Sequence, residues 1–129
     1  MTTTPSTPAA TRTVALAFAT DVICILLFVA VGRRNHAEGV TVAGVAQTAW
    51  PFLAGLAAAW VVGRTWRRPT AIVPTGVGIW LSTIAIGMAL RAATGAGIAV
   101  SFVLVATTVT GVLLLGWRAI VARLARRPG

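Results

Sequence analysis

The chain has 129 residues, of which 57% are hydrophobic, and its formal net charge is +9. This length suffices for one domain, and the apolar fraction exceeds the roughly 45–50% that is usual in soluble domains, which excludes an ordinary water-soluble fold. All eleven basic residues are Arg and nearly all lie at the ends of apolar stretches. Their placement indicates a membrane topology and not a nucleic-acid-binding surface.

Four apolar stretches, about residues 14–32, 44–63, 71–90 and 98–117, dominate the chain. Each is long enough to cross a hydrocarbon core of about 30 Å, which takes about 20 helical residues. The sequence therefore predicts an all-α membrane protein, a four-helix transmembrane bundle made of two hairpins. Residues 13–118 form this transmembrane domain. Residues 1–12, which are polar and contain two prolines, are expected to be a flexible cytoplasmic tail, and residues 119–129 a basic cytoplasmic tail.

The first span contains Asp21, an acid about eight residues past the expected start and so about 12 Å into the membrane. A carboxylate at that depth is costly, so it is expected to face the bundle interior. Hydroxyl groups at a similar depth, on Thr107, Thr108 and Ser82, are the expected partners. Two interpretations remain open: Asp21 takes up and releases a proton coupled to solute movement, or it is a hydrogen-bonded clasp between helices.

The outer ends of spans one and three carry a basic cluster: Arg33, Arg34, His36 and Arg91. These side chains could bind a phosphate or a carboxylate, because a guanidinium group presents a planar fork of donors. The alternative is that they extend toward lipid headgroups and anchor the bundle. The sequence leaves both readings open and favours anchoring.

The second span contains Pro51 and a Gly55/Ala59 pair of small residues. Small residues four apart let membrane helices approach closely, and a membrane helix tolerates an internal proline when neighbours satisfy the freed carbonyl. Span three is preceded by Pro69 and Pro74, so its first turn is expected to be irregular. After span four, Arg118 and three further Arg alternate with apolar residues, which predicts a basic turn lying on anionic lipid.

The distribution of Arg predicts the orientation. Eight Arg lie in the N-terminal tail, the 64–70 connector and the C-terminal tail, and three lie on the opposite side. Short loops rich in Arg stay in the cytoplasm, so both termini are expected there. The use of Arg without Lys, with abundant Ala, Val and Gly, suggests a GC-rich bacterial genome and hence a plasma membrane.

Chemistry-bearing residues are scarce. The acids are Asp21 and Glu38, the only imidazole is His36 and the only thiol is Cys24. These offer no metal-ligand cluster, no phosphate-binding glycine loop and no catalytic triad. We therefore expect neither an enzyme nor a bound metal or cofactor.

Several short motifs resemble a bacterial family of unknown function, DUF3054. They are Asp21, Gly32-Arg33-Arg34-x-His36, Trp50-Pro51-Phe52-x-x-Gly55, Gly87-Met88-x-Leu90-Arg91, Ser101-Phe102-x-x-Val105-Ala106 and Gly116-Trp117-Arg118. The resemblance covers nearly the whole chain after the tail. It implies a small four-span membrane protein without an assigned activity, and it gives added weight to Asp21 and the outer basic cluster.

The functional expectation is a small membrane protein that binds or moves a small solute, with Asp21 as the protonatable group, and that assembles as a homodimer. The alternative is a structural protein, or one that binds anionic lipid headgroups, without transport activity. Membrane lipids are the expected partners in either case, and nucleic acid is not.

Overall fold

A computed structural model of the protein describes residues 8–34 and 40–126. Within these residues the chain forms four long helices and no strand: α1 (Pro8–Arg33), α2 (Val42–Val62), α3 (Val77–Ala93) and α4 (Val100–Arg126). All four are long and apolar enough to cross a membrane, with α3 counted together with the short helix before it. The predicted all-α, four-span membrane fold is thereby confirmed.

Two of the helices are longer than the apolar stretches that predicted them. Helix α1 begins at Pro8, not near residue 14, and a proline suits the first turn because its missing N–H would be unpaired there. Helix α4 continues to Arg126, past the predicted end at residue 117. Residues 119–126 are mostly Ala, Leu and Arg, which favour helix. Arg118 therefore lies inside α4, eight residues before its end.

The connection between α2 and α3 is irregular, as the prolines predicted. It contains a short 3-10 helix, η1 (Thr65–Arg67), and a single wide turn, η2 (Ile72–Gly76). Inside η2, Val73 has an extended backbone with φ −120° and ψ 129°, because the residue before a proline avoids the helical region. Helix α3 proper starts only at Val77, and Gly76 is buried against α4.

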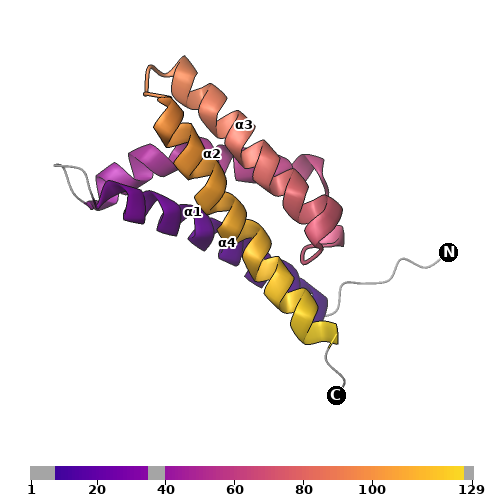
Figure 1. Cartoon of the computed structure of the whole chain (residues 1–129). Helices are drawn as coiled ribbons and strands as arrows, with labels where there is room; N and C mark the ends of the chain where they lie inside the picture. The colour runs from indigo at the N-terminus through magenta and orange to yellow at the C-terminus, as the bar shows by residue number, and fades with distance from the viewer. Residues whose placement is uncertain (1–7, 35–39, 127–129) are drawn as a thin grey trace.

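The helices cross without forming a parallel bundle (Figure 1). Helices α2 and α3 make the most extensive contact, where Gly55 of α2 lies directly on the backbone of α3 at Thr83. About one turn from Gly55 along α2, the ring of Phe52 packs with the rings of Phe28 and Phe102, with centroids 5.6–6.2 Å apart. These three rings join α1, α2 and α4.

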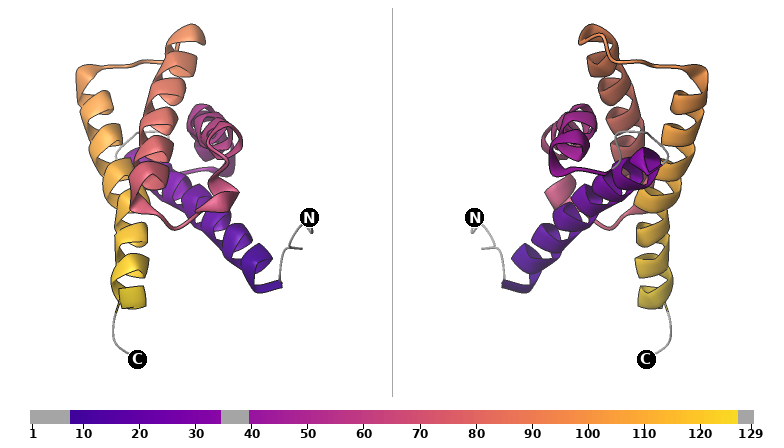
Figure 2. Two further views of the ribbon diagram at one scale, coloured as in Figure 1. Left: turned by 90° about the vertical axis from the view of Figure 1, so that its right-hand side faces the viewer. Right: turned by 90° about the vertical axis from the view of Figure 1, so that its left-hand side faces the viewer.

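The α2–α3 connection contacts both the first half of α1 and the part of α4 around Arg118. Trp66 of the connection lines a shallow groove with Thr11 and Val14 of α1, and Arg118 of α4 donates a hydrogen bond to the carbonyl of Pro69. Figure 2 shows α1 and α4 diverging from the region where they cross. Two buried charged side chains, Asp21 of α1 and Arg118 of α4, lie near that crossing.

Candidate functional site

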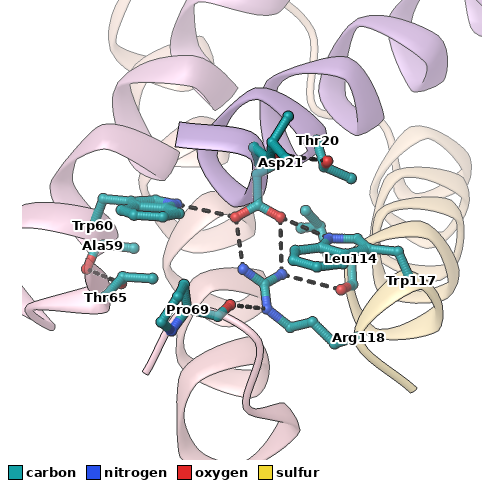
Figure 3. A network of polar contacts seen from close by, with 10 residues as sticks. Thr20, Asp21, Ala59, Trp60, Thr65, Pro69, Leu114, Trp117 and Arg118 are labelled. Carbon is teal, nitrogen blue, oxygen red and sulfur yellow. Dashed lines mark hydrogen bonds and ion pairs between the residues drawn. The ribbon is translucent and has the colours of Figure 1, made fainter. Parts of the chain in front are cut away.

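A buried ion pair joins the first and last helices. The carboxylate of Asp21 in α1 and the guanidinium of Arg118 in α4 are both fully buried, with 0% of each side chain exposed. Two parallel hydrogen bonds connect them, from Nη1 to Oδ1 and from Nη2 to Oδ2, each 2.8 Å long (Figure 3). This fork-to-fork geometry is the strongest arrangement that Arg and a carboxylate adopt.

Two indole groups complete the surroundings of the carboxylate. Trp60 of α2 donates its Nε1–H to Oδ2 over 3.0 Å, and Trp117 of α4 donates its Nε1–H to Oδ1 over 2.9 Å. Each carboxylate oxygen therefore accepts two hydrogen bonds. The four donors come from α2 and α4, so Asp21 ties three helices together at one point.

Arg118 is held in place from all sides. Its Nε donates to the carbonyl of Pro69 over 3.0 Å, and its Nη1 also donates to the carbonyl of Leu114 over 3.1 Å. The guanidinium lies over the ring of Trp117, 4.3 Å from the centroid. A side chain at Gly76 would come within 3.0 Å of Arg118 Cδ, so the glycine makes room for the arginine stem. These contacts link the α2–α3 connection to the ion pair.

The opposite charges of Asp21 and Arg118 balance each other inside the protein. Moving either ion alone out of water costs several kcal/mol, and a partner with good geometry and further hydrogen bonds offsets that cost. Arg118 supplies the opposite charge, while Trp60 and Pro69 supply polar groups from the other elements. Cys24, one turn further along α1, is the neighbouring titratable side chain and is buried.

The predicted hydroxyl partners lie elsewhere. Thr107 uses its backbone carbonyl to accept from Trp80, Thr108 is exposed, and Ser82 lines a groove between α2 and α3. The hydrogen bonds of the Asp21 carboxylate go instead to Trp60, Trp117 and Arg118. Thr107 precedes Arg118 by eleven residues, about 16 Å along a helix, so the level of Asp21 is nearer the end of α4 than the sequence suggested.

Arg118 and the two indoles are the residues that sequence reasoning missed as partners of Asp21. The apolar run ends at residue 117, so the sequence alone predicts that Arg118 extends to lipid at the interface. Two signals pointed the other way. An intramembrane acid needs a partner, and the helix-forming residues after Arg118 place it inside a continuing helix.

The predicted outer basic cluster is spread over two hairpins. Arg33 donates to Thr48 Oγ1 over 3.2 Å and lies against Gly44, so it contacts α2. Arg91 donates twice to the carbonyl of Gly97, over 3.0 and 2.7 Å, and lies over the ring of Phe102. Arg34 is exposed. His36 lies outside the described residues.

A groove runs beside the ion pair but does not open onto it. It has a volume of about 410 Å³ and lies between the end of α2 and the start of α3, with a mostly apolar lining that includes Ala59, Thr65, Thr75 and Gly78. Ala59 directly precedes Trp60, and Gly76, which lies against the Arg118 stem, is between Thr75 and Gly78 in the sequence. Among residues 8–34 and 40–126, no three His, Cys, Asp or Glu side chains gather as metal ligands would.

Among comparisons with known proteins, a match to one protein family was found. The family model described as "Protein of unknown function (DUF3054)" matches residues 18–121, which include both Asp21 and Arg118. No curated protein and no solved structure matches the chain significantly.

Proposed function

We propose that this chain, which belongs to the DUF3054 family of unknown function, binds or moves a small solute across the membrane, with Asp21 as its proton-binding group. The observation that supports the proposal is the fully buried ion pair between Asp21 and Arg118. Ionisable groups within membrane spans are expensive, and those that persist commonly serve ion or proton pathways. No chemical conversion is part of this proposal.

The pair provides an element with two states. When Asp21 is ionised, the two side chains attract each other and hold α1 against α4. When Asp21 binds a proton, Arg118 keeps its charge without a counter-ion, and a buried charge in that condition is strongly destabilising. Protonation therefore favours an arrangement in which Arg118 reaches water or another partner, so that α1 and α4 separate. A solute that binds the separated arrangement better shifts the population toward it.

The irregular α2–α3 connection offers a place for this movement. It contacts both the groove, through Thr75, and Arg118, through Gly76. Its η2 segment contains a non-helical residue and so lacks a continuous helical ladder. A shift of this short segment would connect the groove to the guanidinium without unfolding a long helix.

A structural or lipid-binding role is the second candidate. It is favoured by the complete satisfaction of the Asp21 carboxylate, whose two oxygens together accept four hydrogen bonds. A clasp needs nothing more. In this alternative the Arg side chains at the helix ends, such as Arg34 and Arg123, which are exposed, bind anionic headgroups.

Proton flux in reconstituted vesicles separates the two candidates. The wild type is compared with Asp21→Asn/Arg118→Gln, which removes both charges and keeps a polar side chain at each position. Vesicles that contain a pH-sensitive dye are given gradients of potassium nitrate, potassium pyruvate, methylammonium sulfate or glycerol. We expect at least one gradient to drive proton movement in the wild type and none to do so in the double variant. Equal proton movement in both proteins under every gradient would overturn the transport proposal in favour of the clasp.

Orientation in the plasma membrane forms part of the same proposal, with both termini in the cytoplasm. In a Cys24→Ala background, a cysteine at Ala99, between α3 and α4, should react with an impermeant maleimide in intact cells. A cysteine at Thr70, between α2 and α3, should react only after permeabilisation, because the Arg-rich 64–70 segment stays inside. The reverse labelling pattern would mean that the Arg distribution does not set the topology.

A further inference from the structure

We propose that the solute is a small monovalent anion of the carboxylate class. It accepts hydrogen bonds from the four N–H groups that otherwise donate to Asp21, and it does so when Asp21 is protonated. This inference rests on the proposed function and specifies its substrate. The donors are the two terminal nitrogens of Arg118 and the indole nitrogens of Trp60 and Trp117.

The four N–H donors form an anion-binding site, and in this structure the bound anion is the protein's own Asp21 carboxylate. All four N–H groups point at a single carboxylate, over 2.8–3.0 Å, and none of these four can act as an acceptor. The forked pair from Arg118 fits two oxygens in one plane. A free carboxylate or another planar oxyanion presents the same two oxygens, whereas a cation, such as a protonated amine, would be repelled by Arg118.

Charge conservation in the buried site points to a single negative charge. In the resting arrangement the charges of Asp21 and Arg118 sum to zero. Once Asp21 carries a proton, the site has one excess positive charge, and one monovalent anion restores neutrality. A divalent anion would leave a net negative charge, and a monovalent cation would leave two positive charges. Either uncompensated charge is costly away from water.

The surroundings of Asp21 support coupling to one proton. Arg118 from α4 is the charged group in contact with it, and α2 contributes the indole of Trp60, which does not titrate. The α2–α3 connection contributes the Pro69 carbonyl through Arg118. Cys24, buried one turn away on α1, is the other neighbouring titratable side chain, and it carries no charge as a thiol. A proton entering this site therefore goes to Asp21, and the anion replaces the lost carboxylate charge.

The test uses the full chain in vesicles filled with potassium sulfate and a pH-sensitive dye, with valinomycin and equal potassium concentrations on both sides to hold the membrane potential at zero. The probes are nitrate, a planar anion that does not cross lipid as an acid, and pyruvate, a small carboxylate, both as potassium salts. In place of external sulfate, each should acidify the lumen of wild-type vesicles, and faster as the external pH is lowered. Sulfate on both sides should give only the rate of protein-free vesicles. The Asp21→Asn/Arg118→Gln variant should lose the nitrate and pyruvate response down to that same rate.

The possible outcomes separate the substrate class from the proposed function. If methylammonium or glycerol gradients drive Asp21-dependent proton movement and nitrate and pyruvate do not, the anion inference is wrong and the transport proposal stands. If no gradient moves protons faster in wild-type vesicles than in protein-free ones, both proposals fail. Nitrate uptake without acidification would also overturn the anion–proton inference.

A binding measurement on the wild type gives a check that needs no variant. Ligands that bind only the folded protein raise its melting temperature. In detergent, the Tm in nitrate minus the Tm in sulfate of equal ionic strength should become more positive as the pH is lowered, because the non-specific stabilisation by sulfate does not depend on Asp21. A difference that does not change with pH would overturn the inference.

Discussion

Arg118→Gln is expected to destabilise the bundle by about 3–5 kcal/mol, the cost of leaving a buried charge without its partner. The substitution removes the counter-ion of Asp21, whose side chain is 0% exposed. It also removes the bond to Pro69 that attaches the α2–α3 connection to α4. The measurement is the free energy of unfolding in mixed detergent micelles, with Arg123→Gln as the control. Arg123 is exposed near the end of the same helix, so its replacement should leave the unfolding transition unchanged.

The double variant Asp21→Asn/Arg118→Gln supplies the decisive comparison. Replacing both members of a buried pair is often neutral or stabilising, since no charge is left unpaired. We therefore expect the double variant to be more stable than either single variant, with a coupling energy larger than the few tenths of a kcal/mol seen for independent sites. Additive losses from the two single substitutions would show that the ion pair contributes no specific stability.

The nature of the partner changes what Asp21→Asn alone should do. Sequence reasoning paired Asp21 with hydroxyl groups, and an amide would replace a carboxylate there with little loss, because interhelical hydrogen bonds in membranes average only about 0.6 kcal/mol. With Arg118 as the partner, the same substitution leaves a guanidinium buried and uncompensated. For this reason the neutral double variant, and not Asp21→Asn, is the suitable protein for flux measurements.

The fold was largely predictable from the sequence, and the site was only half predictable. Runs of about 20 apolar residues permit little besides membrane helices, so the four spans and the irregular entry to α3 near Pro74 followed from local rules. Asp21 stood out because an acid in a span is rare. Arg118 did not, since an arginine at the end of an apolar run can extend outward to lipid or turn inward. Only tertiary packing, through Pro69, Gly76 and Trp117, decides between the two.

The packing face made by the small residues of α2 could also be predicted from the sequence, but the helix that packs against it could not. Gly55 and Ala59 were expected to form a packing face, and both are buried. The contact that Gly55 makes is with the backbone of α3, at Ser82 and Thr83. A one-dimensional pattern identifies a face that permits close approach, but it does not say which helix lies against it.

Gly55→Ala is accordingly expected to destabilise the protein by about 1–3 kcal/mol, the usual range for an extra group in a well-packed interior. A Cβ at this position would lie 3.0 Å from Thr83 Cα and 3.1 Å from the Ser82 carbonyl oxygen. Both are backbone atoms, so no side-chain rotation can relieve the contact, and α2 must move away from α3. This pair of helices makes the most extensive contact in the protein, so the loss extends along the interface.

Gly116→Ala provides the matched control for that prediction. Gly116 lies within α4, and a Cβ there would meet no atom within 4 Å. Because glycine inside a helix is less favourable than alanine by roughly 0.5–1 kcal/mol, Gly116→Ala should be neutral or slightly stabilising. Replacing glycine by alanine is thus expected to lower the free energy of unfolding in detergent at Gly55 and to leave it unchanged or raise it slightly at Gly116. A Gly55→Ala protein as stable as Gly116→Ala would mean that α2 and α3 do not pack through Gly55.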